Sequence, residues 1–181
     1  MPVTLLRHTE LTVKSDFCYG DLDVALADSF EEDASRVLAS LPDFDEIYTS
    51  PLVRCRQLAE LIAERSGCDA IPVPALSEMN FGTWQGKNWD DIPVLELDAW
   101  ADEFENARPH GGESIAQFRS RLRGFIKKHP SAPGRKILFV THGGVIRVLL
   151  AMAHQQDERE IQIGYGEVVE LNLPHTKDEL P

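Results

Sequence analysis

Two short apolar runs, far apart in the chain, each end beside a histidine. Residues 3–6 lead into Arg7 and His8, and residues 137–140 lead, after one threonine, into His142. Apolar runs of this length predict strands that are buried on both faces of an open α/β sheet. Such sheets place their sites outside the carboxyl ends of strands, so we expect both imidazoles at one rim of the sheet. One would serve as a nucleophile and the other as its electrostatic partner. The alternative is that each histidine only ends a strand and caps a loop.

Strand and helix signals alternate along the chain. Short apolar runs predict strands over residues 3–6, 46–49, 70–73, 136–140 and 167–173, the last of them an edge strand. Segments with helical periodicity lie between them, over residues 29–41, 50–66, 114–128 and 143–153. This alternation predicts an α/β fold of three layers, with a mostly parallel sheet and helices on both faces.

Residue types at the predicted helix ends support this assignment. Two capping-box patterns are present, Ser29 with Glu32 and Ser114 with Gln117. Ser50 and Pro51 predict an N-cap and a first helical position. Between the elements we expect an irregular loop over residues 9–27 and a turn over residues 130–133.

Residues 76–110 differ from the rest of the chain in composition and hydrophobic periodicity. Phe81, Trp84, Trp89 and Trp100 gather there without a helical or strand period. We predict a loop-and-helix insertion that forms a small cap and walls a pocket. A chain of 181 residues fits one domain, so residues 1–181 are expected to form a single domain with this cap.

The net charge of −12 restricts the class of partner. It argues against a general affinity for nucleic acid or for an anionic membrane surface. A small anionic substrate remains possible where the site is locally positive. No stretch approaches the length of a membrane helix and no basic leader precedes the first apolar run, so we expect a cytoplasmic protein without a membrane partner.

The three cysteines and the remaining histidines show no metal-binding pattern. Cys18, Cys55 and Cys68 form no CxxC motif, which favours free thiols in a reducing cytosol, with Cys55 a packed bystander. Four histidines lack metal-ligand spacing and are expected at the surface, namely His110, His129, His154 and His175. We therefore predict no metal and no cofactor. Residues 177–180 resemble a retention signal of the endoplasmic reticulum, but Pro181 follows them and such signals are read at the free terminus.

Five short motifs occur in a fixed order along the chain. They are Leu6-Arg7-His8, Ser50-Pro51-Leu52-Val53-Arg54, Leu76-Ser77-Glu78 with Phe81-Gly82-Thr83-Trp84-Gln85-Gly86, Gly111-Gly112-Glu113-Ser114, and Thr141-His142-Gly143-Gly144. Together they resemble the histidine phosphatase superfamily, which also contains the cofactor-dependent phosphoglycerate mutases. The resemblance runs from residue 3 to about residue 150. It implies a phosphoglycerate mutase-like fold and a small phosphate ester as substrate. Within the superfamily the strongest likeness is to the α-ribazole phosphatases of cobalamin biosynthesis.

The motif residues suit phosphoryl transfer on chemical grounds as well. A neutral His8 can attack phosphorus in line and form a phosphohistidine intermediate. Arg7 and Arg54 offer permanently charged planar forks for phosphate oxygens. His142, in its protonated form, would stabilise charge in the transition state. Glu78 is the predicted general acid for the leaving oxygen and then the general base for water.

Four further residues are predicted to line the substrate site, and two of them depart from the family pattern. Thr9 stands where the family usually has glycine after the nucleophile, and Lys14 stands where many members have a phosphate-binding asparagine. Residues 18–23, with Tyr19, replace a stretch that normally begins with arginine, so one basic contact is missing. Gly143 is the fourth predicted contact. These departures bear on the identity of the substrate more than on the chemistry.

Three classes of function remain open from the sequence. The leading hypothesis is a metal-independent phosphomonoesterase acting on α-ribazole 5′-phosphate or another small phosphometabolite. The enzymatic alternative is a phosphoglycerate mutase-like phosphotransferase, although mutases of this type usually carry longer insertions. The third is an inactive binding module, which the intact set of five motif residues disfavours. The oligomeric state is open, with a homodimer as one option.

Overall fold

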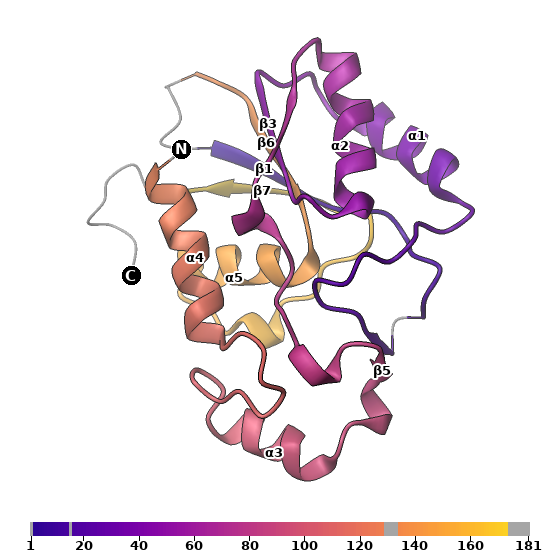
Figure 1. Ribbon diagram of the computed structural model, residues 1–181. Coiled ribbons are helices and arrows are strands. Elements are labelled where there is room, and N and C mark those ends of the chain that lie inside the picture. The colour runs from indigo at the N-terminus through magenta and orange to yellow at the C-terminus, as the bar shows by residue number, and fades with distance from the viewer. Residues whose placement is uncertain (1, 15, 129–133, 174–181) are drawn as a thin grey trace.

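The computed structural model describes residues 2–14, 16–128 and 134–173 (Figure 1). In this part of the chain the main sheet has five strands in the order β4-β3-β6-β1-β7. These strands are β4 (Ala70–Pro72), β3 (Glu46–Thr49), β6 (Ile137–Thr141), β1 (Pro2–Arg7) and β7 (Val168–Asn172). The first four run parallel, and β7 pairs antiparallel with β1 at the edge. The predicted edge strand is thus confirmed.

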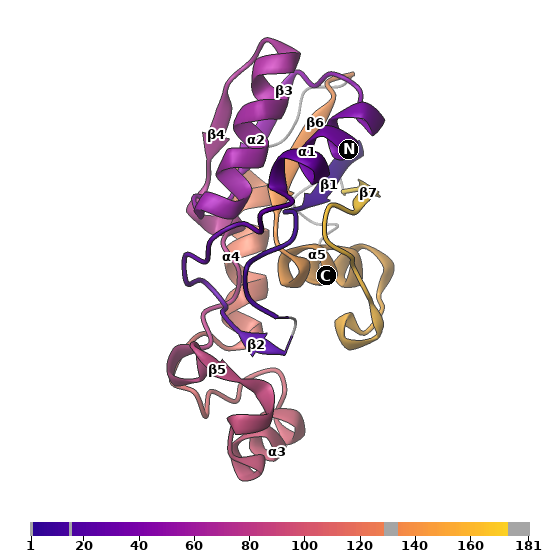
Figure 2. The same ribbon diagram turned by 90° about the vertical axis from the view of Figure 1, so that its right-hand side faces the viewer.

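Helices cover both faces of the sheet, as Figures 1 and 2 show. The four long helices are α1 (Phe30–Ser40), α2 (Val53–Ser66), α4 (Ile115–Lys128) and α5 (Gly143–His154). One hydrophobic cluster joins α1 and α2 to one face of the sheet, and a second joins α4 and α5 to the other. The predicted three-layer α/β architecture is confirmed.

The apolar runs arise because the central strands are buried on both faces. Leu5 and Phe139 pack in the cluster with α4 and α5, while Leu6 and Val140 pack in the cluster with α1 and α2. All four side chains are at most 2% exposed. Successive residues of a strand point to opposite faces, so a strand covered on both faces needs apolar residues at every position.

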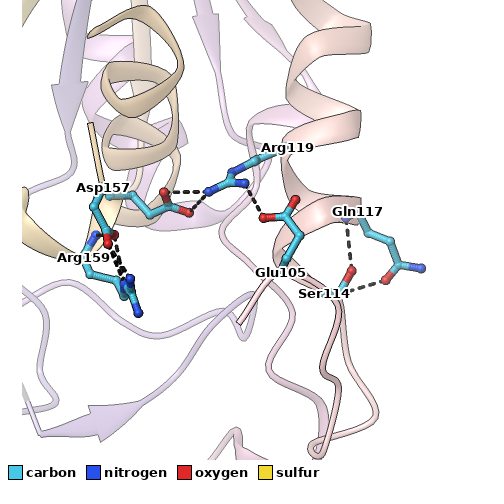
Figure 3. Close-up of polar contacts among 7 residues, drawn as sticks. Glu105, Ser114, Gln117, Arg119, Asp157 and Arg159 are labelled. Atoms are coloured by element: carbon cyan, nitrogen blue, oxygen red, sulfur yellow. Dashed lines mark hydrogen bonds and ion pairs between the residues drawn. The ribbon is translucent and has the colours of Figure 1, made fainter. Parts of the chain in front are cut away.

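The helix starts agree with the predictions in one case and differ in two. At α4 the capping box is present, since Gln117 N donates to Ser114 Oγ at 3.2 Å and Ser114 N donates to Gln117 Oε1 at 3.0 Å (Figure 3). At α1 the hydroxyl of Ser29 donates to Asp33 Oδ2 at 2.7 Å and caps no backbone group. The predicted capping box with Glu32 is therefore wrong.

Helix α2 begins at Val53, later than the predicted start at Ser50 and Pro51. The hydroxyl of Ser50 lies 2.7 Å from Nε2 of His142 and accepts from the N–H of Leu52 at 3.3 Å, and Leu52 is the extended residue before the helix. The backbone N–H of Val53 donates to Asp23 Oδ1 at 2.9 Å. A carboxylate from the first long loop thus satisfies a free N–H of this helix start.

Residues 76–110 form a group of short elements below the sheet in Figure 1. These are η2 (Gly82–Trp84), β5 (Lys87–Asn88), η3 (Trp89–Asp91) and α3 (Val94–Asp102), preceded by η1 (Pro74–Leu76). They have a small cluster of their own around the fully buried Trp84, whose Nε1 donates to Glu96 Oε2 at 2.6 Å. We refer to residues 76–110 as the cap segment.

The first long loop is tied to the cap segment. Strand β2 (Phe17–Cys18) pairs antiparallel with β5, so the purely irregular loop predicted over residues 9–27 is wrong. The described residues include no helix long and apolar enough to cross a membrane. The predicted turn at residues 130–133 and the tetrapeptide 177–180 lie outside the described residues.

Candidate active site

The parallel pairing of β1 with β6 brings the two strand-end histidines together. Arg7 is in register with Thr141, and the backbone N–H of His8 donates to the carbonyl of Thr141 at 3.0 Å. The ring centroids of His8 and His142 lie 5.3 Å apart. The predicted meeting of the two imidazoles at one rim of the sheet is confirmed.

His8 is held in the form that a nucleophile requires. Its Nδ1 lies 2.8 Å from the carbonyl oxygen of Thr9, which can only accept, so Nδ1 carries the proton. Nε2 then has a free lone pair, and it is buried without a partner among the described residues. Burial lowers the pKa of His8 well below 6.5, and the nearby charge of Arg54 lowers it further. The imidazole is therefore neutral at neutral pH.

His142 is also neutral in this structure. The Nε of Arg54 donates to Nδ1 of His142 at 3.3 Å, so the proton resides on Nε2, which lies 2.7 Å from the hydroxyl of Ser50. Burial and then the charge of Arg54 lower the pKa of His142 well below 6.5. This differs from the expected protonated form, because full burial and the positive charges of Arg54, Arg121 and Arg7 all lower the pKa of His142. A bound phosphate dianion would shift this balance toward protonation.

Arg54 lies in the first turn of α2 and is fully buried. Its Nη1 donates to the carbonyl of Leu22 at 2.5 Å and its Nη2 to the carbonyl of Gly20 at 2.7 Å. With the contact to His142, the whole guanidinium is oriented by the loop after β2 and by the second histidine. Arg54 is therefore not a solvated surface charge.

Arg7 is held by Tyr19, which the sequence predicted at the site, and by Ile163 and Tyr165, which it did not. Its Nη1 donates to the carbonyl of Ile163 at 2.6 Å, and its Nη2 lies 3.4 Å from the hydroxyl of Tyr19. The guanidinium carbon stands 3.9 Å from the ring centroid of Tyr165. The only signal for Tyr165 was an aromatic residue between two glycines just before the edge strand.

Glu78 sits against the start of α5. Its Oε1 accepts from the N–H of Met79 and its Oε2 from the N–H of Gly144, both at 3.0 Å. A Cβ on Gly144 would lie 2.2 Å from Oε1 of Glu78, so any larger residue at this position would displace the carboxylate from where it lies. Gly143 has a related function, because a Cβ there would stand 3.3 Å from Nε of Arg7. The Gly-Gly pair thus admits two charged side chains to the helix start.

A cavity of about 560 Å³ opens beside these residues. Arg7, Tyr19, Glu78 and Gly143 line one end of it. The remaining wall is largely aromatic and apolar and includes Phe17, Phe81, Trp89, Trp100, Phe104, Ile115, Phe118 and Val148. His8, Arg54 and His142 do not line this cavity, since each is at most 1% exposed.

Thr9 and Lys14, which both depart from the family pattern, lie in different environments in the structure. Thr9 is buried next to His8, and its Oγ1 has no partner among the described residues. Lys14 is exposed and does not line the cavity, so the structure does not bring it to the site.

Two other predictions concern side chains near the site. His110 is 1% exposed and packs 4.7 Å from the ring of Trp84, so its predicted surface position is wrong. A backbone N–H, that of Gly112, donates to its Nδ1 at 2.9 Å. Cys55 is a fully buried free thiol that donates to the carbonyl of Thr141, and burial raises its pKa, which agrees with a packed bystander. Within residues 2–14, 16–128 and 134–173, no cluster of three or more His, Cys, Asp or Glu could hold a metal ion.

Comparison with known proteins identifies the family. The sequence profile of the histidine phosphatase superfamily (branch 1) matches residues 3–180. The chain belongs to this superfamily. It is therefore a phosphatase-like or mutase-like enzyme, and the predicted resemblance is confirmed. Among solved structures, a phosphoglycerate mutase from Thermus thermophilus is similar at a TM-score of 0.76 and 27% identity, over 97% of this chain and 95% of that one.

Relatives with different activities match at similar identity. A probable phosphoglycerate mutase GpmB of Erwinia tasmaniensis is 31% identical over 83% of this chain and 74% of its own length. An adenosylcobalamin/alpha-ribazole phosphatase of Salmonella typhimurium is 31% identical over 60% of this chain and 55% of that protein. A metal-independent phosphoserine phosphatase of Arabidopsis thaliana is 35% identical over 74% and 57%. These alignments span little more than half of the two phosphatases, so superfamily membership leaves the substrate open.

Proposed function

We propose that the protein is a phosphomonoesterase that works through a phosphohistidine intermediate on His8. The observation that carries this proposal is the state of His8. It is neutral, its Nδ1 proton is fixed on the carbonyl of Thr9, and its Nε2 lone pair is free. Arg7 and Arg54 supply the positive charge that a phosphate needs in a chain whose net charge is −12.

The proposed reaction proceeds in two displacements. In the first, Nε2 of His8 bonds to phosphorus as the ester P–O bond breaks, and Glu78 gives a proton to the leaving alcohol. In the second, water attacks the phosphohistidine and gives its proton to Glu78 as the P–N bond breaks. Arg7, Arg54 and His142 bind the non-bridging oxygens in both steps. His8 and a newly protonated Glu78 are regenerated, with inorganic phosphate as product.

For the substrate we propose α-ribazole 5′-phosphate, with other small phosphate esters as the alternative. The aromatic lining of the cavity supports an ester whose alcohol carries a sizeable flat ring, because such rings pack well against Phe and Trp side chains. A three-carbon phosphoglycerate would leave most of the 560 Å³ unfilled. In this proposal the cap segment forms part of the wall that holds the alcohol.

The nucleophile is tested with His8→Ala and an aryl phosphate. We expect kcat to fall by at least about 1,000-fold, because loss of a covalent nucleophile removes the proposed route. His154→Ala, at an exposed histidine on α5, is the matched control and keeps full activity. Acid-quenched wild-type enzyme should show a phosphohistidine signal by ³¹P NMR that His8→Ala lacks. Full activity of His8→Ala would exclude the mechanism.

The substrate is tested with a panel of phosphate esters under steady-state conditions. We expect the highest kcat/KM for α-ribazole 5′-phosphate, and lower values for phosphoserine and 3-phosphoglycerate. Conversion of 3-phosphoglycerate to its isomer without release of phosphate would favour the mutase-like alternative. Loss of activity with a chelator, restored by a divalent metal, would contradict the metal-independent mechanism. Binding of a phosphate ester without any turnover would favour the inactive binding module.

A further inference from the structure

The loop before β7 contributes an aromatic ring to the site, and no catalytic motif includes it. Tyr165 lies between Gly164 and Gly166, directly before the edge strand. Its ring lies 3.9 Å from the guanidinium carbon of Arg7 and 5.6 Å from the ring centroid of His8. One side chain therefore contacts both members of the Arg-His motif.

The backbone fixes this loop to the strand that carries Arg7 and His8. Gly166 N donates to the carbonyl of His8, and Arg7 N donates to the carbonyl of Glu167, both at 3.1 Å. Just beyond, β7 pairs with β1 along its whole length. These main-chain hydrogen bonds place the backbone of the Tyr165 loop beside Arg7 and His8.

The other contacts of Arg7 are made by its nitrogen atoms, while the ring of Tyr165 lies over one face of the guanidinium. Nη1 and Nη2 are directed at the carbonyl of Ile163 and the hydroxyl of Tyr19, while Nε is buried and has no partner among the described residues. Arginine donates in the plane of its guanidinium, and a stacked ring sets that plane. The hydroxyls of Tyr19 and Tyr165 lie 3.5 Å apart, which links the ring to the first loop as well.

We propose that Tyr165 is a positioning residue of the phosphatase site, whose stacked ring sets the guanidinium plane of Arg7 and walls the imidazole of His8. The inference rests on the proposed function, in which Arg7 binds the transferring phosphate. Tyr165 itself performs no proton transfer. Its ring matters and its hydroxyl is secondary, because the stacking involves the ring face.

The test compares Tyr165→Leu with Tyr165→Phe. Tyr165→Leu is expected to lower kcat/KM for phenyl phosphate by about thirty-fold, mostly in kcat, and to weaken inhibition by orthovanadate by a similar factor. Tyr165→Phe keeps the flat ring and should restore both quantities to within about three-fold of wild type. Tyr48→Leu is the matched control, since it removes a ring that packs against Phe125 and Phe139 in the core. It is expected to lower stability without changing either quantity per folded molecule.

A spectroscopic measurement separates positioning from general destabilisation. The Nε–Hε resonance of Arg7 should carry a ring-current shift in wild type and Tyr165→Phe, and should lose it in Tyr165→Leu. Equal activity and equal shifts in the Leu and Phe variants would overturn the proposal. If wild type hydrolyses no phosphate ester, the proposed function fails. The Arg7 resonance and orthovanadate binding would still decide whether Tyr165 positions Arg7.

Discussion

Three consecutive residues each leave one buried polar atom without a partner among the described residues. They are Nε of Arg7, Nε2 of His8 and Oγ1 of Thr9. Such atoms are rare in protein interiors because an unpaired buried donor or acceptor costs about 1–3 kcal/mol. Two donors and one nucleophilic lone pair in adjacent residues are the groups that a phosphate ester would satisfy. The unpaired atoms of these three residues therefore lower the stability of the fold at the site of the proposed reaction.

Gly144 offers a test at the scale of a single residue. Gly144→Ala should lower kcat by about a hundred-fold or more, the usual range for loss of a general acid. The added methyl would lie 2.2 Å from Oε1 of Glu78 and push the carboxylate off the start of α5. The measurement is kcat for an activated aryl phosphate and for an alkyl phosphate, with the larger loss on the alkyl ester because its leaving group needs the proton more.

A second glycine provides the control for this substitution. Gly124 lies inside α4 and a Cβ there would meet nothing within 4 Å. Gly124→Ala should leave kcat unchanged and stabilise the protein by about 0.5–1 kcal/mol, since alanine is the better helix former. If Gly144→Ala and Gly124→Ala changed kcat equally, the position of the Glu78 carboxylate would not require glycine at position 144.

At the scale of elements, an ion-pair network joins the cap segment, α4 and η4 (Glu158–Glu160). Arg119 of α4 donates to both carboxylate oxygens of Glu158 at 2.6 and 2.7 Å and to Glu105 of the cap segment (Figure 3). The side chain of Glu158 is only 8% exposed, and it lines the cavity. This partly buried ion pair, in which Nη2 of Arg119 donates to both carboxylate oxygens of Glu158, therefore fixes one wall of the candidate substrate site.

Arg119→Met should lower the free energy of unfolding by about 3 kcal/mol, because it leaves the carboxylate of Glu158 buried and unpaired. Urea unfolding measures this loss. The double variant Arg119→Met, Glu158→Met should recover most of it, since no charge then remains buried. Arg36→Met breaks the surface ion pairs that the exposed Arg36 forms with Glu32 and Asp33 and is the matched control, with an expected cost of at most about 1 kcal/mol. If Arg119→Met lowered the free energy of unfolding no more than Arg36→Met, burial of the Glu158 carboxylate would not require its ion pair with Arg119.

Regular elements were predictable because their signals are local. Strand β3 falls where the apolar run placed it, and α4 begins with the predicted capping box. The start of α2 was predicted too early. The hydroxyl of Ser50 is shared between the N–H of Leu52 and His142, a residue 92 positions away, while Asp23 accepts from the first helical N–H. The preference of serine for the N-cap is a statistical tendency, and tertiary contacts override it at this helix start.

At the scale of the whole molecule, the buried histidines couple stability to pH. The pKa values of His8 and His142 are lowered well below 6.5 in the folded protein, while the unfolded chain titrates near 6.5. Below about pH 6.5 the unfolded state therefore binds more protons than the folded state, and stability falls as pH falls. Each histidine contributes up to about 1.4 kcal/mol per pH unit in this range.

Urea unfolding between about pH 7.5 and pH 5.5 measures this dependence. The variants His8→Gln and His142→Gln should each flatten the slope, and the exposed His154→Gln should leave it as in wild type. Stability that is independent of pH over this range would contradict the neutral, buried state on which the proposed nucleophile depends. The expected direction is opposite to that of a histidine stabilised by a buried carboxylate.

The sequence by itself determined the layers of the fold, the edge at which the two histidines meet and the superfamily. These follow from apolar runs buried on both faces and from motifs written in adjacent positions. Only the tertiary structure decided which groups hold Arg7 and Arg54, the neutral state of His142 and the aromatic cavity. Irregular segments supply those contacts, with Tyr19 and Tyr165 lying 146 positions apart. Loops carry no period that reveals what they touch, and protonation depends on burial that exists only once the chain has folded.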